Sequence, residues 1–270
     1  MKIKKVLSGI LLGVLSLGLV ACSNGSDENA ITQLEEIKEK GKLVIATSAD
    51  FPPYEFHKEI DGKDTIVGFE IMMAEEIAKE LGVELEIKDM KFDGVLAALQ
   101  AGNVDMVLAG MTPTEERKQA VNFTEKFYNG EIGILINKKD LEKYTTLESL
   151  KDVNVGAQKS SLQESLATDT IKATNLKLLS KVSDLVVELN NDNIDALVCN
   201  KQSVTGYLKQ YKELCFANVD IESGTEGVAI AIKKSDDLSL VEKSNEILSK
   251  LKSENKIDEF VNEATELSQD

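Results

Sequence analysis

The 270-residue sequence contains no tryptophan and a single histidine, His57, and aromatic residues make up only 5% of it. One histidine is too few for a His-rich zinc site, and it also excludes most Ser-His-Asp and Cys-His catalytic arrangements. The sequence contains neither G-x-G-x-x-G nor G-x-S-x-G, and no Walker-type G-K-[ST]. We therefore expect no bound cofactor or metal, and we expect His57, which stands among charged residues, in a solvated loop.

Positive charge is scarce relative to negative charge. The sequence has 31 Lys and Arg against 47 Asp and Glu, which gives a net charge of −16 at pH 7. Proteins that bind nucleic acid depend on basic residues that neutralise phosphates, so this balance excludes nucleic acid as a partner. Net negative charge of this size instead favours a soluble monomer.

The first 22 residues differ in composition from the rest of the chain. Three lysines at positions 2, 4 and 5 precede an apolar run over residues 6–20. That run is shorter than the roughly 20 residues that a membrane-spanning helix needs. It ends in Leu19-Val20-Ala21-Cys22, which resembles the lipobox of bacterial lipoproteins, where the cysteine is acylated and becomes the new N-terminus. We therefore predict a lipoprotein signal peptide over residues 1–21 and a lipid on Cys22.

Residues 22–30 are small and polar, as expected of a flexible tether between a membrane anchor and a folded domain. The alternative is an ordinary secretory signal with an incidental cysteine at position 22. Both alternatives place the mature chain outside the cytoplasm, and removal of residues 1–21 changes the net charge to −19 because it takes away three lysines and no acid. An extracytoplasmic setting permits a disulfide between Cys199 and Cys215, but sequence alone does not fix the geometry that a bridge needs, and two separate buried thiols are the alternative.

Apolar residues recur with the periodicities of strands and helices in alternation. Their spacing from Phe69 to Leu81 predicts a helix that ends at Gly82. Strands that alternate with helices predict an α/β fold of mainly parallel sheets flanked by helices. Strands are expected at 43–46, 83–87, 104–109, 132–136, 153–157, 194–198 and 228–232, and further helices at 95–101, from about 113, at 182–189, 237–252 and 256–266.

Two stretches that lie 90 residues apart have the same order of features. Residues 99–108 and 189–198 each contain the end of a helix, a turn, Asn, an apolar residue, Asp and an apolar strand. This similarity indicates two lobes of similar construction, although αβ turns that merely look alike would give the same pattern.

Ligands of open α/β sheets bind beyond the carboxyl ends of the strands. After the first strand, two prolines stiffen residues 47–54 and present Phe51 as an aromatic platform, unless Phe51 is a core residue. After the strand at 104–109, Thr112, Pro113 and Glu115 fit a capping box that would begin a helix and expose its N–H groups to an anion. Arg117 follows, and its guanidinium matches a carboxylate in bidentate fashion unless it only pairs with a neighbouring glutamate.

Polar groups also follow two strands of the second predicted lobe. Ser161 and Glu164 fit a capping box after the strand at 153–157. Asn200 follows the strand at 194–198. The four strand ends thus carry an aromatic ring, an arginine, two helix starts and an amide. This set of groups suits a small zwitterion that carries a carboxylate.

Several motifs resemble the polar amino acid-binding proteins of ABC importers. The resemblance covers about residues 40 to 266 in order, and the stretch from Ala109 to Phe123 is highly specific. The residues that carry it are Ala46-Thr47-x-x-x-Phe51-x-Pro53-x-Glu55-Phe56, Val67-Gly68-Phe69-Glu70, Met90-x-Phe92-Asp93-Gly94, Ala98-Leu99-Gln100, Gly110-Met111-Thr112-x-Thr114-x-Glu116-Arg117 and Val121-x-Phe123-Thr124.

Membership of this family implies a two-lobe, type II periplasmic-binding-protein-like fold with two hinge crossings. Lobe 1 would comprise residues 31–127 and 228–270, and lobe 2 residues 132–222, with hinges at 128–131 and 223–227. The resemblance also implies that closure of the lobes buries a small polar amino acid, which the protein then delivers to the permease of an ABC transporter.

The resemblance assigns roles to individual residues. Phe51 and Phe92 would flank the ligand side chain, Arg117 would hold the α-carboxylate, and Gln158 would contact the ligand side chain. The complete set of expected ligand-binding residues is Phe51, Phe92, Gly110, Met111, Thr112, Arg117, Gln158, Ser161, Leu162 and Asn200.

Two positions depart from the family pattern. Many relatives have Asp, which pairs with the ligand ammonium, where this chain has Asn200, and relatives that bind basic or glutamine side chains often have Asp at the position of Ser48. Both departures favour a neutral polar or sulfur-containing amino acid, and they leave Glu131 as a substitute partner for the ammonium. They also remove two carboxyl groups that a dehydratase-like enzyme on the same fold would use, so we expect no enzyme; a sensor lipoprotein is the other alternative.

Overall fold

The computed structural model describes residues 31–222 and 227–269. The predicted signal peptide, the predicted lipidation site at Cys22, the predicted tether and all but one residue of the second predicted hinge lie outside the described residues. The helices are α1 (Gln33–Lys40), α2 (Phe69–Leu81), α3 (Phe92–Gln100), α4 (Glu115–Ala120), η1 (Lys138–Asp140), η2 (Leu147–Leu150), α5 (Leu162–Ser165), η3 (Leu166–Thr170), α6 (Val182–Asn190), α7 (Lys201–Gln210), α8 (Ser239–Ser253) and α9 (Lys256–Leu267).

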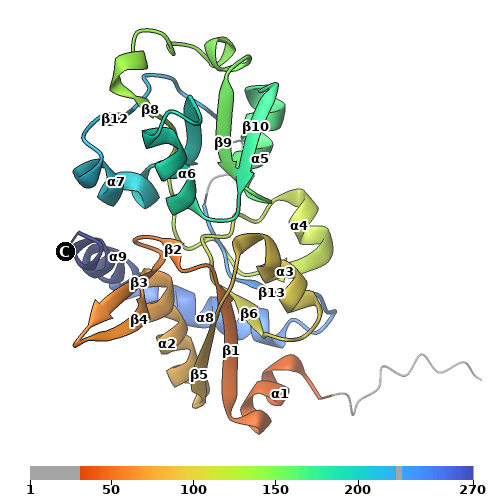
Figure 1. The fold of residues 1–270 in the computed structure, drawn as a ribbon. Coiled ribbons are helices and arrows are strands. Elements are labelled where there is room, and N and C mark those ends of the chain that lie inside the picture. The colour runs from red at the N-terminus through yellow and green to blue at the C-terminus, as the bar shows by residue number, and fades with distance from the viewer. Residues whose placement is uncertain (1–30, 223–226, 270) are drawn as a thin grey trace, which may run out of the picture. The chain divides into compact units, whose positions relative to one another are not determined.

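The first sheet contains five strands in the order β5-β1-β6-β13-β7 (Figure 1). Strands β5, β1 and β6 are parallel, and β13 runs antiparallel to both of its neighbours. Four of the five strands therefore run in one direction. The strand bounds are β1 (Lys42–Thr47), β5 (Glu84–Asp89), β6 (Met106–Val107), β7 (Val121–Phe123) and β13 (Ala231–Lys233).

The second sheet repeats this plan in the order β10-β9-β11-β8-β12 (Figure 1). Strands β10, β9 and β11 are parallel, and β8 is the one strand that runs the other way. Because β6 and β11 hold the same place in their sheets, the similarity of residues 99–108 and 189–198 reflects two lobes of the same design, as predicted. The bounds are β8 (Ile132–Asn137), β9 (Asn154–Gln158), β10 (Asn175–Leu179), β11 (Ala196–Asn200) and β12 (Leu214–Phe216).

A third, antiparallel sheet of three strands, β2 (Asp50–Phe51), β3 (Glu55–Ile60) and β4 (Lys63–Val67), was not predicted. Its hairpin turns at Asp61 and Gly62, whose φ angles of 53° and 76° are those of the Asp-Gly turn that suits a two-residue hairpin loop. His57 is solvent-exposed, as expected, but the expectation that it lies in a loop is wrong. His57 is part of β3, and its ring nitrogens lie 3.0 Å from the carboxylate of Asp64 and 3.3 Å from that of Asp89.

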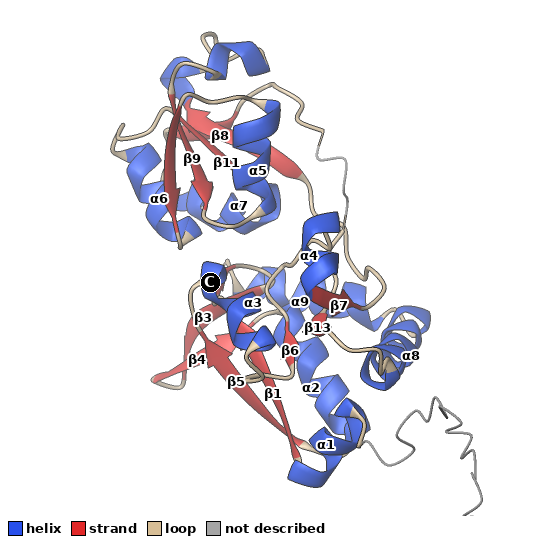
Figure 2. Cartoon of the chain, turned by 90° about the vertical axis from the view of Figure 1, so that its right-hand side faces the viewer, coloured by secondary structure: helices blue, strands red, loops and turns tan. Residues whose placement is uncertain are grey.

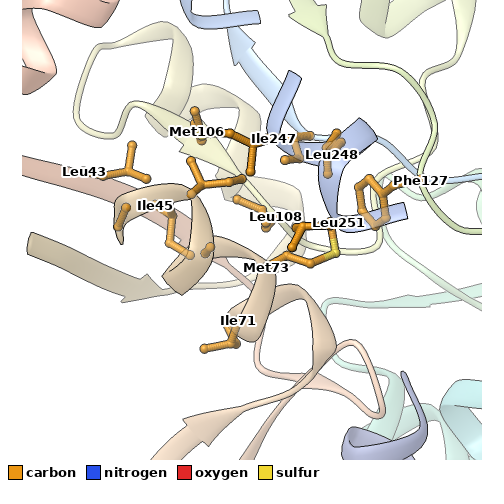
Figure 3. Packing of buried hydrophobic residues seen from close by; sticks show 14 of the residues in the cluster. Leu43, Ile45, Ile71, Met73, Met106, Leu108, Phe127, Ile247, Leu248 and Leu251 are labelled. Carbon is orange, nitrogen blue, oxygen red and sulfur yellow. The ribbon is translucent and has the colours of Figure 1, made fainter. Parts of the chain in front are cut away.

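Each of the two five-stranded sheets has its own hydrophobic core. In lobe 1, Leu43 and Ile45 of β1 pack with α2 and α8 through Met73 and Leu248 (Figure 3). Figure 2 shows α2 and α8 beside this sheet, and α6 and α7 beside the second one. In lobe 2, Ile134 and Val155 belong to one cluster on one side of the sheet, and Leu135 and Leu185 belong to another on the other side. Alternation of buried residues along β8 thus covers both faces of its sheet.

The two cysteines of lobe 2 are both free thiols. Cys199 on β11 belongs to the cluster that contains Leu185, whereas Cys215 on β12 packs against the cluster that contains Val155. The two side chains therefore lie on opposite faces of the sheet, which explains why they do not form a disulfide. In residues 31–222 and 227–269, no helix is long and apolar enough to cross a membrane, and no three acidic, histidine or cysteine side chains are grouped to hold a metal ion.

Candidate functional site

Phe51 stands on β2 at the boundary between the lobes. Its ring centroid lies 4.8 Å from that of Tyr54, and it packs against the core clusters of both lobes. Gly110, which follows β6, adopts a φ of +57°, and a Cβ atom there would come within 2.8 Å of Phe51 Cε1. Only glycine combines this left-handed backbone with the close approach of the ring. Phe51 is therefore partly a core residue and partly a wall of the site.

The helix that carries Arg117 does not begin where the sequence predicted. Thr114, and not Thr112, is the N-cap of α4, because its hydroxyl accepts the backbone N–H of Arg117. Glu115 is consequently the first residue of the helix, and its carboxylate pairs with Lys118 instead of closing a capping box. The prediction of a capping box at Thr112 is wrong. With only six residues, α4 offers an anion little through its N-terminus, and the guanidinium of Arg117 is the cationic group that lines the cavity here.

Arg117 is the only arginine in the sequence. Its two terminal nitrogens each donate a hydrogen bond of 2.8 Å, one to the carbonyl of Thr112 and one to the carbonyl of Ser160 in lobe 2. Within the described residues these bonds leave three of its five N–H groups available for a carboxylate. The guanidinium lies 5.6 Å from the ring centroid of Phe92, close enough for a cation–π interaction. Burial lowers the pKa of Arg117 to about 10, which still leaves it charged at neutral pH.

Gln158 and Ser161 bring lobe 2 to the same place. Gln158, at the end of β9, is buried and donates its side-chain amide to the carbonyl of Ser180 over 3.1 Å. Ser161 is the N-cap of α5, as predicted, and accepts the N–H of Glu164 at 3.3 Å. The carboxylate of Glu164 accepts the N–H of Ser160, one residue before the position that a complete capping box requires. The prediction that Ser161 is an N-cap is confirmed. The return hydrogen bond of a capping box, from the N–H of Ser161 to the carboxylate of Glu164, is not formed.

Asn200 is 5% exposed and is committed to two other contacts. Its carbonyl oxygen caps α7 by accepting the N–H groups of Gln202 and Ser203, and its amide nitrogen donates to the hydroxyl of Tyr54 over 3.1 Å. The side-chain carbonyl of Asn200, the one atom of this side chain that could accept the ligand ammonium, is thus occupied by helix capping. Glu131 does not replace it, because its exposed carboxylate pairs with Lys201 at 3.1 Å.

A small cavity brings most of the predicted residues together. Met111, in contrast, is 1% exposed and belongs to the core behind β6, and Ser161 borders a neighbouring hollow beside Arg117. The cavity is lined by the predicted Phe51, Phe92, Gly110, Thr112, Arg117, Gln158 and Leu162, and by Ser48, Glu55, Ala109 and Gln163, which were not predicted.

Glu55 is the most consequential of the residues that sequence analysis missed. Its side chain is fully buried and lines the cavity, and neither carboxylate oxygen has a hydrogen-bond partner among the described residues. Burial raises the pKa of Glu55 well above its usual value, and the nearby carboxyl groups of Glu70 and Asp50 add to this effect. Glu55 occurs in the family motif but received no role, although a lone acid between Tyr54 and Phe56 was a signal that it is buried.

Glu70 is a second fully buried acid and supports the wall of the site. Both of its carboxylate oxygens lie within 3.2 Å of the backbone nitrogen of Gly110, which donates to them. Burial raises the pKa of Glu70 to about 8, and the hydrogen bond from Gly110 opposes that rise. Glu70 therefore fixes the orientation of the Gly110 peptide that borders the cavity.

Two further contacts cross between the lobes beside the cavity. The carboxylate of Asp50 on β2 accepts the N–H of Val182, the first residue of α6, over 2.6 Å. The N-cap residue of α6 is Lys181, which has no capping side chain, so lobe 1 supplies the cap of this lobe 2 helix. Lys159 of lobe 2 forms an ion pair of 2.9 Å with Asp93 of α3.

Two α/β lobes joined around a polar cavity define a solute-binding protein of the two-lobe type. The model of the bacterial extracellular solute-binding proteins, family 3, matches residues 43–264, and the chain belongs to this family. It is 33% identical over 262 residues to the arginine-binding extracellular protein ArtP of Bacillus subtilis, covering 95% of this chain and 96% of that protein. It is 29% identical to a probable histidine-binding protein of Campylobacter jejuni, covering 96% of this chain and 97% of that protein.

A solved structure of the amino acid ABC transporter substrate-binding protein AbpA of Streptococcus pneumoniae, bound to L-arginine, has a similar fold. It superimposes with a TM-score of 0.84 at 36% identity and covers 87% of this chain and 99% of that chain. The prediction of a type II periplasmic-binding-protein fold is thereby confirmed.

Proposed function

We propose that the chain is a lipid-anchored receptor that captures an amino acid between its lobes and delivers it to an ABC importer. The observation that carries this proposal is Arg117. Its guanidinium lines the cavity beside Phe92, bonds to carbonyls of both lobes and retains free N–H groups of the geometry that a carboxylate accepts. An α-carboxylate bound there would add to the contacts that hold the lobes together.

The ligand that we propose has a cationic side chain, with arginine as the first choice. Glu55 supports this choice because a buried carboxylate without partners is costly unless a ligand supplies donors. The names of the relatives point in the same direction. Ser48 and Asn200 by themselves favour a neutral side chain, but Glu55 adds a carboxyl group to the same cavity.

In this proposal, the lobes have the predicted boundaries. They open and close about hinge crossings at residues 128–131 and 223–227. Acylation of Cys22 would hold the protein at the outer face of the membrane next to the permease. Replacement of Cys22 by Ala should abolish incorporation of a labelled fatty acid and release the protein from the membrane fraction. Retention of the label would refute the assignment of the lipid to Cys22.

The direct test is a thermal-shift screen of the refolded protein against the common L-amino acids. A ligand that binds only the folded state at 100 times its Kd adds about 2.7 kcal/mol of stability, which raises the Tm by several degrees. We expect arginine to give the largest shift. A panel without any shift would refute the proposed function.

Arg117→Lys tests the role of the guanidinium because it keeps the charge and removes the planar fork. Hydrogen bonds to charged groups contribute about 1.5–3 kcal/mol, so we expect the Kd for arginine to rise by roughly 10- to 150-fold. Lys118→Ala, one residue further along α4, breaks an exposed ion pair with Glu115 and serves as the control. Equal affinity of Arg117→Lys and the wild type would exclude a bidentate carboxylate contact.

A further inference from the structure

Glu55 and Glu70 form a pair of buried carboxyl groups at the cavity, which we call the acid pair. Glu55 begins β3 and Glu70 is the second residue of α2, and the two elements meet because the N–H of Glu70 donates to the carbonyl of Tyr54 over 3.1 Å. Neither side chain is more than 1% exposed. Lobe 1 thus buries two acids on neighbouring elements, where neither has access to bulk water.

The two acids differ in their contacts. Glu70 accepts the N–H of Gly110, whereas both oxygens of Glu55 are unpartnered within the described residues and line the cavity. Glu55 is therefore the member of the acid pair that can meet a ligand, and Glu70 is the member that the protein itself holds in place. An isolated buried carboxylate neutralises itself by taking up a proton.

The titratable groups around Glu55 act in the same direction. Besides Glu70, they are Asp50 on β2 and Asp89 at the end of β5, both acidic, and each raises the pKa of Glu55. Tyr54, which precedes β3, is held neutral by burial. The one basic side chain that lines the same cavity is Arg117, which already donates to two carbonyls and which the proposed function commits to the ligand carboxylate.

We propose that the cavity exchanges a proton for the cationic side chain of its ligand, so that the binding of arginine releases the proton of Glu55 to solvent. This inference rests on the proposed function. Before binding, the carboxyl group of Glu55 is neutral. In the complex, the guanidinium donates to the carboxylate of Glu55, the O–H bond of the acid is broken, and its proton passes to the buffer.

The exchange has two consequences for binding. The affinity for arginine should rise as the pH rises toward the pKa of free Glu55, because fewer protons then have to be displaced, and it should weaken in acid. A neutral ligand of the same shape gains nothing from ionisation of Glu55, so the acid pair discriminates by charge as well as by shape. Citrulline, which replaces the guanidinium by a urea group, is the matched neutral ligand.

The test is isothermal titration calorimetry of the full-length protein with arginine and with citrulline, at pH 7 in phosphate and in Tris. These buffers differ in ionisation enthalpy, so the difference in binding enthalpy counts the protons released. For arginine we expect about one proton per ligand and an association constant that rises up to about tenfold per pH unit below neutrality. For citrulline we expect weaker binding and no release.

Glu55→Gln keeps the shape of the protonated acid and should bind arginine without proton release. Thermal unfolding of this variant verifies that it is folded. Glu86→Gln, on the exposed face of β5, is the control and should behave as the wild type. Binding of arginine without proton release by the wild type would overturn the exchange and leave the proposed function intact. Release with both ligands would assign Glu55 to the α-ammonium and overturn it as well. Absence of binding by any amino acid would refute the proposed function itself.

Discussion

The hydroxyl of Tyr54 accepts a hydrogen bond of 3.1 Å from the side-chain amide of Asn200, and this bond joins the two lobes. Both side chains are buried. Tyr54 also packs on Phe69 of α2 and on Tyr128 at the predicted first hinge, with ring centroids 4.7 and 5.7 Å away. The contact therefore lies where movement of one lobe against the other would break it.

Tyr54→Phe should weaken ligand binding because it removes this bond between the lobes. A typical hydrogen bond contributes about 0.5–1.5 kcal/mol, so we expect the Kd to rise roughly threefold to tenfold. Calorimetric titration measures the change. Tyr144→Phe is the matched control, since Tyr144 is equally buried but bonds to Asp195 within lobe 2. It should lower stability and leave the Kd unchanged. Equal affinity of Tyr54→Phe and the wild type would mean that the bound form does not contain the Tyr54–Asn200 bond.

Gly130→Ala should hinder closure of the lobes. A Cβ atom at Gly130 would lie 2.2 Å from Asn200 Nδ2 and 2.4 Å from Tyr54 Oη, too close for either to remain in place. We expect an affinity loss of roughly 5- to 150-fold, which corresponds to the 1–3 kcal/mol that overpacking costs. Titration calorimetry and small-angle scattering with saturating ligand would measure it.

Gly94→Ala provides the comparison for Gly130→Ala. Gly94 lies in α3, where an added Cβ meets no atom within 4 Å. Alanine is favoured over glycine in a helix by about 0.5–1 kcal/mol, so this variant should be slightly more stable and bind normally. Normal closure of Gly130→Ala would show that the side chains of Tyr54 and Asn200 can move apart to make room for a methyl group.

The unliganded protein should become less stable as the pH rises from about 5 to 8.5. The pKa of Glu70 is about 8 in the folded chain against 4.5 for an ordinary glutamate, so the folded state holds a proton that the unfolded state has lost. The stabilisation is complete below about pH 4.5 and is lost as the pH passes through 8, with a slope of at most about 1.4 kcal/mol per pH unit for one group. Urea unfolding at pH 5.5, 7 and 8.5 measures it.

Glu70→Gln should reduce that slope, because glutamine has the shape of the protonated acid and keeps an acceptor for Gly110. Part of the slope should remain, since the pKa of Glu55 is also raised. A wild-type stability that is constant between pH 5.5 and 8.5 would contradict the burial of protonated acids at these two positions.

The thiols of lobe 2 should differ in reactivity. Cys199 is fully buried, and burial raises its pKa to about 12, so we expect no reaction with a thiol reagent in the native Cys22→Ala variant. Cys215 is partly exposed and should react slowly. Unfolding should expose two thiols per chain without reductant. Recovery of none would indicate a disulfide, and the Tm would then depend on reductant.

Local signals were sufficient for much of the fold. Apolar periodicity and Gly82 located α2 with its observed bounds, because helix propensity, amphipathicity and the C-cap agree there. The similar turns before β6 and β11 predicted the two lobes. The hairpin of β3 and β4 was missed although Asp61-Gly62 marks its turn, since few apolar residues flank the turn.

The site was predictable in its participants and less so in their contacts. Thr112 and Thr114 both suit the N-cap position, and the sequence does not distinguish them. In the structure Thr114 caps α4, while the backbone carbonyl of Thr112 accepts a hydrogen bond from the guanidinium of Arg117. Asn200 carries the amide that a ligand would need, but helix capping and Tyr54 occupy it. Burial of Glu55 results from packing of segments distant in the chain, which no local pattern encodes.

The solitary arginine has a practical consequence. A reagent selective for guanidinium groups, such as phenylglyoxal, has one target in the whole sequence, and that target lines the cavity. The mass added by such a reagent would therefore count the sites that hold no ligand. If a bound carboxylate protects Arg117, the unlabelled fraction of the native protein would measure how many sites hold a ligand.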